Sequence, residues 1–221
     1  YVCVTGVHGV IECQRDATLR AVHNAAYLVT PDGMPLVWAL KLAGYRRSDR
    51  VYGPDLMLAV FDSGRGNGLR HFLYGSSQAT LDRLRSRLLE RFPGAEIVGS
   101  LSPPFRALEE TEEDAIAQAI NATGADIVWV GLSTPKQELW MARMRDRLTP
   151  PVLIGVGAAF DFHAGVKRQA PRFVQRSGFE WLYRLASEPR RLGARYAVAV
   201  PSFLWLAAIQ ATGLRRFPLD Q

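Results

Sequence analysis

One stretch of the chain combines a backbone pattern that suits phosphate with polar side chains beside it. It runs from Gly131 to Glu138 and reads Gly-Leu-Ser-Thr-Pro-Lys-Gln-Glu. The largely apolar residues 126–130 precede it and a helical pattern follows, so we expect a strand, a tight turn and a helix start. Pro135 suits the first helical turn, where its missing N–H would have no partner anyway. Unpaired backbone N–H groups at such a turn favour an anion, although an ordinary strand-to-helix loop fits these residues equally well.

A single carboxylate is the second candidate for chemistry. Asp32 lies between Pro31 and Gly33, just after the apolar run 27–30, which predicts a short buried strand. An acid in that position lies at the edge where α/β sheets gather their ligands, whereas Pro-Asp-Gly taken alone is more often a plain turn. The apolar residues 34–40 that follow predict a buried helix ending near Gly44.

Positive charge is concentrated near the C-terminus. The chain carries a net charge of +6, and the segment 167–195 accounts for all of it, because two acids there face eight basic residues. Such a cluster serves nucleic acid, anionic lipid or a polyanionic substrate. The eight are Lys167, Arg168, Arg172, Arg176, Arg184, Arg190, Arg191 and Arg195.

Alternating strands and helices must position these groups. Helical patterns near residues 14–24, 81–88, 111–120 and 136–148 separate most of the apolar runs, and the glycine-rich residues 62–68 predict a surface loop. This alternation predicts an α/β fold with a doubly wound, mostly parallel, Rossmann-like sheet whose ligands gather at the C-terminal strand ends. No dinucleotide fingerprint or Walker loop is present, which disfavours NAD binding and ATP hydrolysis. The expected strands are residues 1–7, 27–30, 71–74, 96–99, 126–130 and 152–156.

The segment from Val166 onward departs from this alternation. Its aromatic and apolar residues are interleaved with arginines, as in amphipathic helices with a basic face, although solvated arginines on a structural helix give the same pattern. We therefore divide the chain into an α/β domain, residues 1–165, and a C-terminal basic, amphipathic helical appendage, residues 166–221.

An uncharged run, residues 196–214, lies inside this appendage between Arg195 and the pair Arg215 and Arg216. Its length meets the minimum for a transmembrane span, but Pro201 and Gln210 weaken that interpretation. Three interpretations stay open: a helix lying in the membrane interface, a core or oligomer helix, and a true span.

Four ordered blocks of the sequence are residues 30–38, 131–138, 155–161, and 178–185 with 188–192. Together they resemble the WecG/TagA/CpsF family of bacterial glycosyltransferases, and the resemblance covers nearly the whole chain. It implies inverting transfer of a sugar from a nucleotide donor, usually UDP-linked, to a sugar on a polyprenyl diphosphate in the membrane. Products of such enzymes are wall teichoic acid linkage units, enterobacterial common antigen or exopolysaccharide repeat units.

The resemblance implies roles for residues that end the strands. Asp32 corresponds to the family's proposed general base, which takes the proton from the acceptor hydroxyl as that oxygen attacks the anomeric carbon. Gln137, with Gly131 in the same block, and Asp161 match positions that contact the nucleotide, and Asp161 is expected to read the uracil.

The first strand carries both a match and a departure from the family. Thr5 matches a threonine expected to line the same pocket, whereas many members have an Asn where this chain has Val7. We expect His8 to take over the contact of that Asn. The departure is also the only sequence support for a rival interpretation, a catalytically inactive nucleotide-binding membrane adaptor of the same fold.

Cations of the protein are expected to hold the leaving diphosphate, because no Asp-x-Asp motif for a metal is visible. The resemblance implies that Arg184 and Arg191 do so, joined by Arg190 or Arg195, since the matching appendage supplies arginines to the active site. We therefore expect no metal and no cofactor.

The resemblance also implies where the protein works. The appendage is expected to dock on the inner face of the bacterial cell membrane, where the acceptor lies, which makes the protein cytoplasmic and peripheral. Cys3 and Cys13 match no zinc pattern and suggest no disulfide framework, in keeping with a reducing cytosol. The apolar tail leaves a homo-oligomer possible. A nucleic-acid-binding module is disfavoured, because no known motif accompanies the basic cluster.

Overall fold

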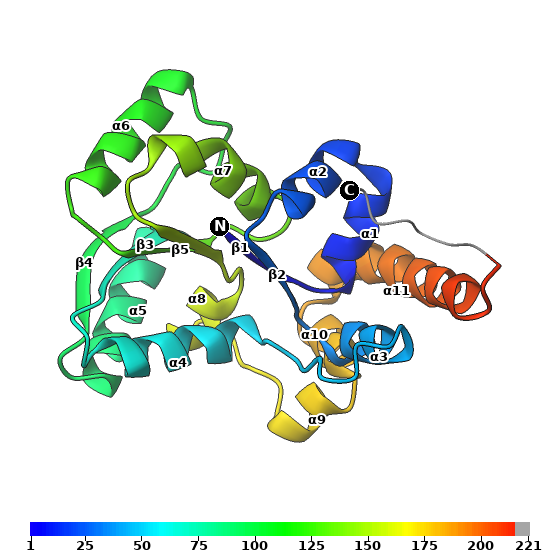
Figure 1. Cartoon of the computed structure of the whole chain (residues 1–221). Helices are drawn as coiled ribbons and strands as arrows, with labels where there is room; N and C mark the ends of the chain where they lie inside the picture. The colour runs from blue at the N-terminus through cyan, green and yellow to red at the C-terminus, as the bar shows by residue number, and fades with distance from the viewer. Residues whose placement is uncertain (215–221) are drawn as a thin grey trace.

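A parallel β-sheet lies at the centre of the computed structural model, which describes residues 1–214 (Figure 1). Within those residues six strands pair in the order β2-β1-β6-β5-β3-β4, and every pairing is parallel. This confirms the predicted doubly wound sheet. The strands are β1 (Val2–Thr5), β2 (Leu28–Pro31), β3 (Arg70–Gly75), β4 (Glu96–Leu101), β5 (Ile127–Gly131) and β6 (Val152–Gly155).

Helices cover both faces of this sheet. They are α1 (Val7–Arg15), α2 (Ala17–Asn24), α3 (Met34–Leu42), α4 (Gly53–Gly64), α5 (Gln78–Arg91), α6 (Glu110–Asn121), α7 (Lys136–Met144), continued by the 3-10 turn Arg145–Arg147, and α8 (Ala159–His163). Alternate residues of β5 point to opposite faces, as strand geometry requires. Ile127 and Trp129 pack with α4, α5 and α8, whereas Val128 and Val130 pack with α6 and α7. An apolar core therefore lies on each face of the sheet, between the strands and the helices that Figure 1 shows on either side.

Side-chain caps begin three of these helices where the sequence offers an acceptor. Asp16 Oδ1 accepts the backbone N–H of Thr18 at 2.8 Å and so starts α2. Ser77 caps α5 in the same way, and Glu109 with Glu112 forms a capping box at α6. Such caps satisfy N–H groups that a helix leaves unpaired, and each contributes about 1 kcal/mol.

A crevice is expected where the connections of the sheet change direction. The chain leaves β3 toward β4 on one side, and it leaves β5 toward β6 on the other. Ligands of open α/β sheets bind at such switch points, beyond the C-terminal strand ends. Gly75 and Gly131 are register partners there, and a Cβ on Gly75 would lie 2.7 Å from the Gly131 carbonyl oxygen. Only glycine allows this close approach, and Gly75 also has a positive φ of 121°.

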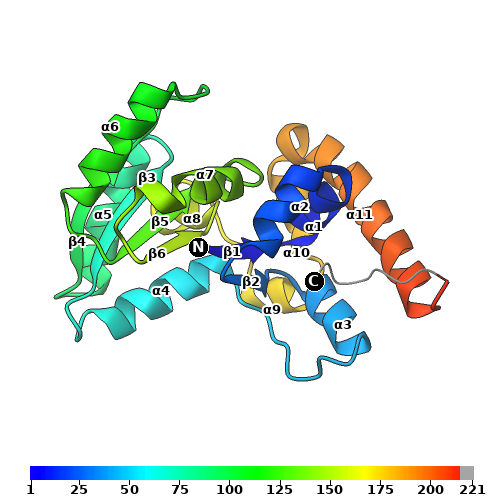
Figure 2. The same cartoon turned by 45° about the horizontal axis from the view of Figure 1, so that its top comes forward.

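Three further helices form the C-terminal segment, α9 (Arg172–Arg176), α10 (Glu180–Ser187) and α11 (Pro189–Ala211). Helix α11 packs on α1 and α10, with Leu192 and Ala199 buried. Its far half projects away from the sheet (Figure 2). By length and composition alone it is the one helix in the described residues that qualifies as a candidate membrane span. The predicted flanking pair Arg215 and Arg216 lies outside the described residues.

Four local predictions were wrong. The strand expected to be buried, β2, is an edge strand with only β1 as its neighbour, so Leu28 and Val29 are exposed. The helix expected to be buried, α3, buries Leu36 and Val37 but exposes Trp38. The predicted helix near 14–24 is two helices that meet at Asp16, and α4 takes up the start of the predicted 62–68 loop.

Candidate active site

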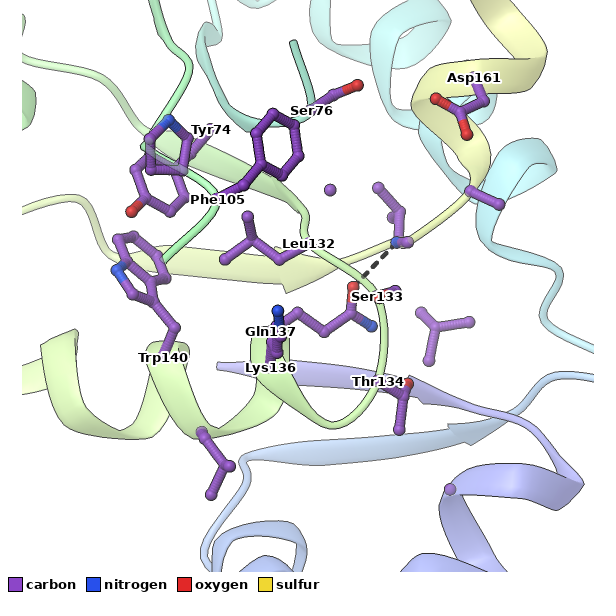
Figure 3. Close-up of a pocket in the computed structure, with 18 of the residues that line it drawn as sticks. Tyr74, Ser76, Phe105, Leu132, Ser133, Thr134, Lys136, Gln137, Trp140 and Asp161 are labelled. Carbon is purple, nitrogen blue, oxygen red and sulfur yellow. Dashed lines mark hydrogen bonds between the residues drawn. The ribbon is translucent and has the colours of Figure 1, made fainter. Parts of the chain in front are cut away.

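A cavity of about 790 Å³ opens at the C-terminal ends of the strands (Figure 3). This volume is typical of small-molecule sites. Its walls come from the turns after β1, β2, β3, β5 and β6, from the loop before α6, and from α10 and α11. The sheet and the C-terminal segment therefore share one cavity.

Most of the predicted site residues line this cavity. They are His8, Asp32, Gly131, Gln137, Asp161, Arg184, Arg191 and Arg195. Thr5 and Arg190 are not among the lining residues. Thr5 is buried beneath the site, with its Oγ1 3.2 Å from His23 Nε2, and Arg190 is exposed on the first turn of α11.

Asp32 is held at the end of β2 by a backbone hydrogen bond and an ion pair. Its N–H donates to the Thr5 carbonyl at 2.8 Å, which fixes the turn against β1. Its Oδ1 accepts a hydrogen bond from Arg50 Nη2 at 3.2 Å. The same Arg50 nitrogen donates to Glu180 Oε2 at 2.6 Å, and Arg50 Nη1 donates to the Gln175 carbonyl at 3.1 Å. Arg50 thereby joins the turn after β2 to α9 and α10.

The surroundings of Asp32 bring the pKa of its carboxyl group close to neutral pH. Burial raises the pKa of Asp32 to about 6, while the positive charge of Arg50 opposes that rise and the Glu180 carboxylate adds to it. A general base works best when its pKa lies near the operating pH. The arrangement therefore suits Asp32 to proton abstraction. Arg50 and Glu180 were missed by the sequence analysis.

Gln137 ties two turns of the cavity wall together. Its Oε1 accepts the backbone N–H of Gly157 at 3.0 Å, the contact drawn in Figure 3, and its Nε2 donates to Glu138 Oε1 at 3.0 Å. Glu138 Oε1 also accepts the Thr134 hydroxyl at 2.8 Å. The carboxylate thus fixes which way the Gln137 amide faces, and the turn after β5 is locked to the turn after β6.

Backbone strain marks two of the turns that line the cavity. Ser76 after β3 and Ser133 after β5 have positive φ values of 58° and 70° although neither is glycine. Such residues cost about 1–3 kcal/mol and gather at ligand sites, where the surrounding structure holds them in place. Pro135 occupies the N-cap position of α7, directly before Lys136. The sequence had predicted it one residue further on, inside the first helical turn.

Positive charge dominates the polar lining. Basic side chains from both parts of the chain converge on the cavity, namely Arg106, Lys136, Arg143, Lys167, Arg184, Arg191 and Arg195. Burial lowers the pKa of Arg191, and the nearby Arg184 and Arg195 lower it further. Arg191 and Lys167 already contact the Glu188 carboxylate, whereas Arg184 and Arg195 form no ion pair within residues 1–214. A bound anion offsets the repulsion among these cations, so the cavity suits a phosphate or diphosphate.

The two remaining ionisable candidates are less open to a ligand. Asp161 Oδ2 is 2.9 Å from Lys167 Nζ. His8 Nδ1 is 3.7 Å from Glu12 Oε1, and burial, followed by the charge of Arg195, lowers the pKa of His8. His8 is therefore a neutral imidazole at the cavity edge.

Aromatic rings form one end of the cavity. Tyr74 and Trp140 stack with their centroids 4.0 Å apart, and Phe105, which lines the same cavity, has 87% of its surface exposed (Figure 3). An exposed ring inside a cavity is available to stack on a planar ligand. Phe105 belongs to a loop that follows a strand, so its position at the ligand-binding edge was predictable, but nothing in the sequence assigned this ring a role of its own.

Comparison with known proteins agrees with the geometry of the cavity. A family profile described as "Glycosyl transferase WecG/TagA/CpsF family" matches residues 1–217. The chain belongs to this family. It is also similar to a protein of Bacillus spizizenii (strain ATCC 23059 / NRRL B-14472 / W23), named as an N-acetylglucosaminyldiphosphoundecaprenol N-acetyl-beta-D-mannosaminyltransferase. The two are 30% identical over 193 residues, which cover 87% of this chain and 72% of the relative.

Membership makes the protein a glycosyltransferase of the WecG/TagA/CpsF family, as the sequence predicted. Within residues 1–214, no group of three or more His, Cys, Asp and Glu side chains is placed to hold a metal ion. The roles of the individual site residues stay predictions, as does the division of the chain at residue 165.

Proposed function

We propose that this glycosyltransferase moves a sugar from a UDP-sugar to a saccharide carried by a polyprenyl diphosphate, with inversion and without a metal. One observation carries the proposal: a single cavity contains a carboxylate with a pKa of about 6 and a crowd of cations. A glycosyl transfer from a nucleoside diphosphate needs both, because one proton is removed from the acceptor and a diphosphate leaves.

Asp32 is the base in this proposal. The acceptor hydroxyl oxygen attacks the anomeric carbon from the side opposite the diphosphate, so one displacement inverts that carbon. Asp32 takes the hydroxyl proton as the new C–O bond forms and the bond to the UDP oxygen breaks. Arg50 keeps the carboxylate oriented, through its 3.2 Å contact with Oδ1.

Arg184, Arg191 and Arg195 stabilise the departing diphosphate. All three line the cavity and come from α10 and α11. Preorganised cations lower the barrier most where charge develops in the transition state, and removing one such donor typically costs about 10²–10³ in rate. Burial lowers the pKa of Arg191, and Arg184 and Arg195 lower it further; both effects support this role, because a bound anion offsets them.

The diphosphate is assigned to the basic side chains, and the uridine is assigned to the aromatic part of the cavity. Phe105 offers a ring on which a base stacks. Asp161 contacts Lys167 through Oδ2, so we assign Oδ1 to a uracil N–H. Gln137 holds the wall between base and diphosphate.

The acceptor and the place of work follow from the relative. Its name describes transfer of N-acetylmannosamine to N-acetylglucosaminyl-diphospho-undecaprenol, and we propose an acceptor of this class in cell-envelope polymer synthesis. A lipid-linked acceptor brings the enzyme to the cytoplasmic face of the membrane as a peripheral protein. The far half of α11, with Leu204 and Trp205 exposed, supports that placement.

The test is release of UDP in the presence of UDP-sugars and a short-chain prenyl-diphosphate N-acetylglucosamine, with and without EDTA. We expect transfer that EDTA does not slow, and a fall in kcat of about 10²–10⁴ for Asp32→Asn. Wild-type turnover by Asp32→Asn would refute the base assignment. Tight UDP binding with no turnover by the wild-type protein would instead favour the inactive adaptor that Val7 suggests.

A further inference from the structure

A second apolar and basic surface lies outside the C-terminal segment. It is formed by α3 and the turn after it, where Trp38, Leu42 and Tyr45 are 46%, 81% and 59% exposed. Trp38 and Leu42 are four residues apart on the helix and share one face. We define the α3 surface as Trp38, Lys41, Leu42, Tyr45, Arg46 and Arg47.

The charge of the α3 surface has one sign. Lys41, Arg46 and Arg47 are all exposed, and none of them forms an ion pair within residues 1–214. Exposed tryptophan, tyrosine and leucine next to lysine and arginine are typical of protein surfaces that lie in the headgroup region of a bilayer. Each basic residue near an anionic leaflet strengthens the attraction about fivefold.

The α3 surface is fixed beside the C-terminal segment. The Trp38 ring lies against Gly178, where an added Cβ would be 2.5 Å from the ring, so α3 contacts the turn between α9 and α10 directly. Figures 1 and 2 both show α3 and the far half of α11 at the same end of the molecule, away from α5 and α6. Two exposed apolar elements, distant in sequence, thus occur at one end.

We propose that the α3 surface is a second contact with an anionic lipid surface, in addition to α11. The proposal rests on the proposed function. Helix α3 begins two residues after Asp32, so a bilayer contact through α3 holds the base at a fixed distance from a lipid-linked acceptor. Two contacts on separate elements also set the tilt of the enzyme, which a single helix leaves free.

A second copy of the chain fits this surface less well than lipid does. A two-fold interface between identical patches brings each residue toward its own patch on the partner. Lys41, Arg46 and Arg47 would then face like charges, which destabilises the pair. Anionic headgroups complement all three.

Vesicle co-sedimentation tests the proposal. The variant Leu42→Ser/Tyr45→Ser removes apolar groups without touching the cavity, and Tyr27→Ser is the matched control because Tyr27 is 90% exposed at the start of β2, at the other end of the sheet. With vesicles of phosphatidylcholine and phosphatidylglycerol, we expect the double variant to bind at least about tenfold more weakly and the control to bind like wild type. The variant Lys41→Gln/Arg46→Gln/Arg47→Gln should bind pure phosphatidylcholine vesicles like wild type, but its binding should not become stronger when phosphatidylglycerol is added. Equal binding by wild type and double variant, or no vesicle binding by wild type, overturns the proposal.

Two further measurements separate the lipid contact from other roles. With a water-soluble short-chain acceptor the double variant should keep wild-type kcat, and with the acceptor embedded in vesicles it should be slower. Loss of soluble-acceptor turnover would show that the α3 surface supports the site itself, and a change in sedimentation coefficient would show that it binds a second copy; either overturns the proposal. If the wild type transfers no sugar at all, the proposed function fails, while vesicle binding still decides the role of the α3 surface.

Discussion

Arg50 contacts both Asp32 and Glu180, and we call this arrangement the Arg50 bridge. It predicts that substitutions at Arg50 and at Glu180 shift the Asp32 pKa in opposite directions. Arg50 Nη2 contacts Asp32 at 3.2 Å and Glu180 at 2.6 Å, and its charge opposes the rise of the Asp32 pKa. An arginine next to an acid lowers the pKa of that acid by about 1–3 units. Arg50→Met is therefore expected to raise the Asp32 pKa from about 6 by that amount. Glu180→Gln removes a like charge and leaves Arg50 to Asp32 alone, so it lowers the Asp32 pKa.

The acid limb of the kcat/KM profile reads these shifts directly, because Asp32 accepts a proton only when ionised. Arg50→Met should lose activity at pH 7 and regain it at higher pH, whereas Glu180→Gln should stay active at lower pH than wild type. UDP release measured from pH 4.5 to pH 9.5 gives both profiles. The control is Arg65→Met, since Arg65 forms a surface ion pair with Asp62 and no other ion pair within residues 1–214.

Stability has to be followed in the same experiment. Removing one member of a buried ion pair costs about 3–5 kcal/mol, so thermal unfolding of Arg50→Met must show that it is folded at the assay temperature. If Arg50→Met is not folded at that temperature, Glu180→Gln still tests the direction in which the Asp32 pKa shifts. An acid limb that stays in place in both variants, or moves the same way in both, refutes the reasoning.

Three further predictions concern stability, each measured by urea unfolding. Burial raises the Asp32 pKa from 3.8 to about 6, so stability falls by up to about 3 kcal/mol as pH rises from 3.8 through 6. Asp32→Asn should recover up to that amount at pH 8 but not at pH 4, because the Arg50 charge still has Glu180 as its partner. Burial lowers the His71 pKa from 6.5 to about 4, so the stability that depends on neutral His71 is present above pH 6.5 and is lost as pH falls through 4. His71→Asn should abolish that loss of about 3 kcal/mol, and an unchanged dependence of unfolding free energy on pH would contradict the prediction. Gly75→Ala should cost about 2 kcal/mol or more, because its Cβ meets the Gly131 carbonyl at 2.7 Å, whereas Gly94→Ala, with a φ of 89° and open space around it, should cost only about 1 kcal/mol.

The sequence predicted the centre of the sheet better than its edge. Buried parallel strands are apolar on both faces, so residues 71–74 and 127–130 stand out as short apolar runs, and α5 shows its core face through Leu81, Leu84 and Leu88. The same rule misled at β2, because an apolar run does not reveal that a strand has only one neighbour.

The candidate site was predictable where it depends on strand ends and unpredictable where it depends on tertiary contacts. Asp32, Gln137 and Asp161 follow strands, and the topology of an α/β sheet brings such positions together. Arg50 follows no strand, and its partners on α9 and α10 are 125 and 130 residues away in sequence. A charged residue in a loop carries no local signal of that kind, so only the folded chain reveals the bridge.

The Arg50 bridge also limits how the two parts of the chain can be dissected. Arg184, Arg191 and Arg195 come from the C-terminal segment, and so do Gln175 and Glu180. Deleting that segment therefore removes three cavity cations and two partners of Arg50 at once. Loss of activity in such a truncation would not tell whether the anion site or the Asp32 pKa had failed. The two causes separate in single variants. Arg195 lines the cavity, but its charge is not among those that shift the Asp32 pKa, so Arg195→Gln should lower kcat without moving the acid limb. Glu180→Gln should move the acid limb, so these two variants tell apart two contributions that truncation removes together.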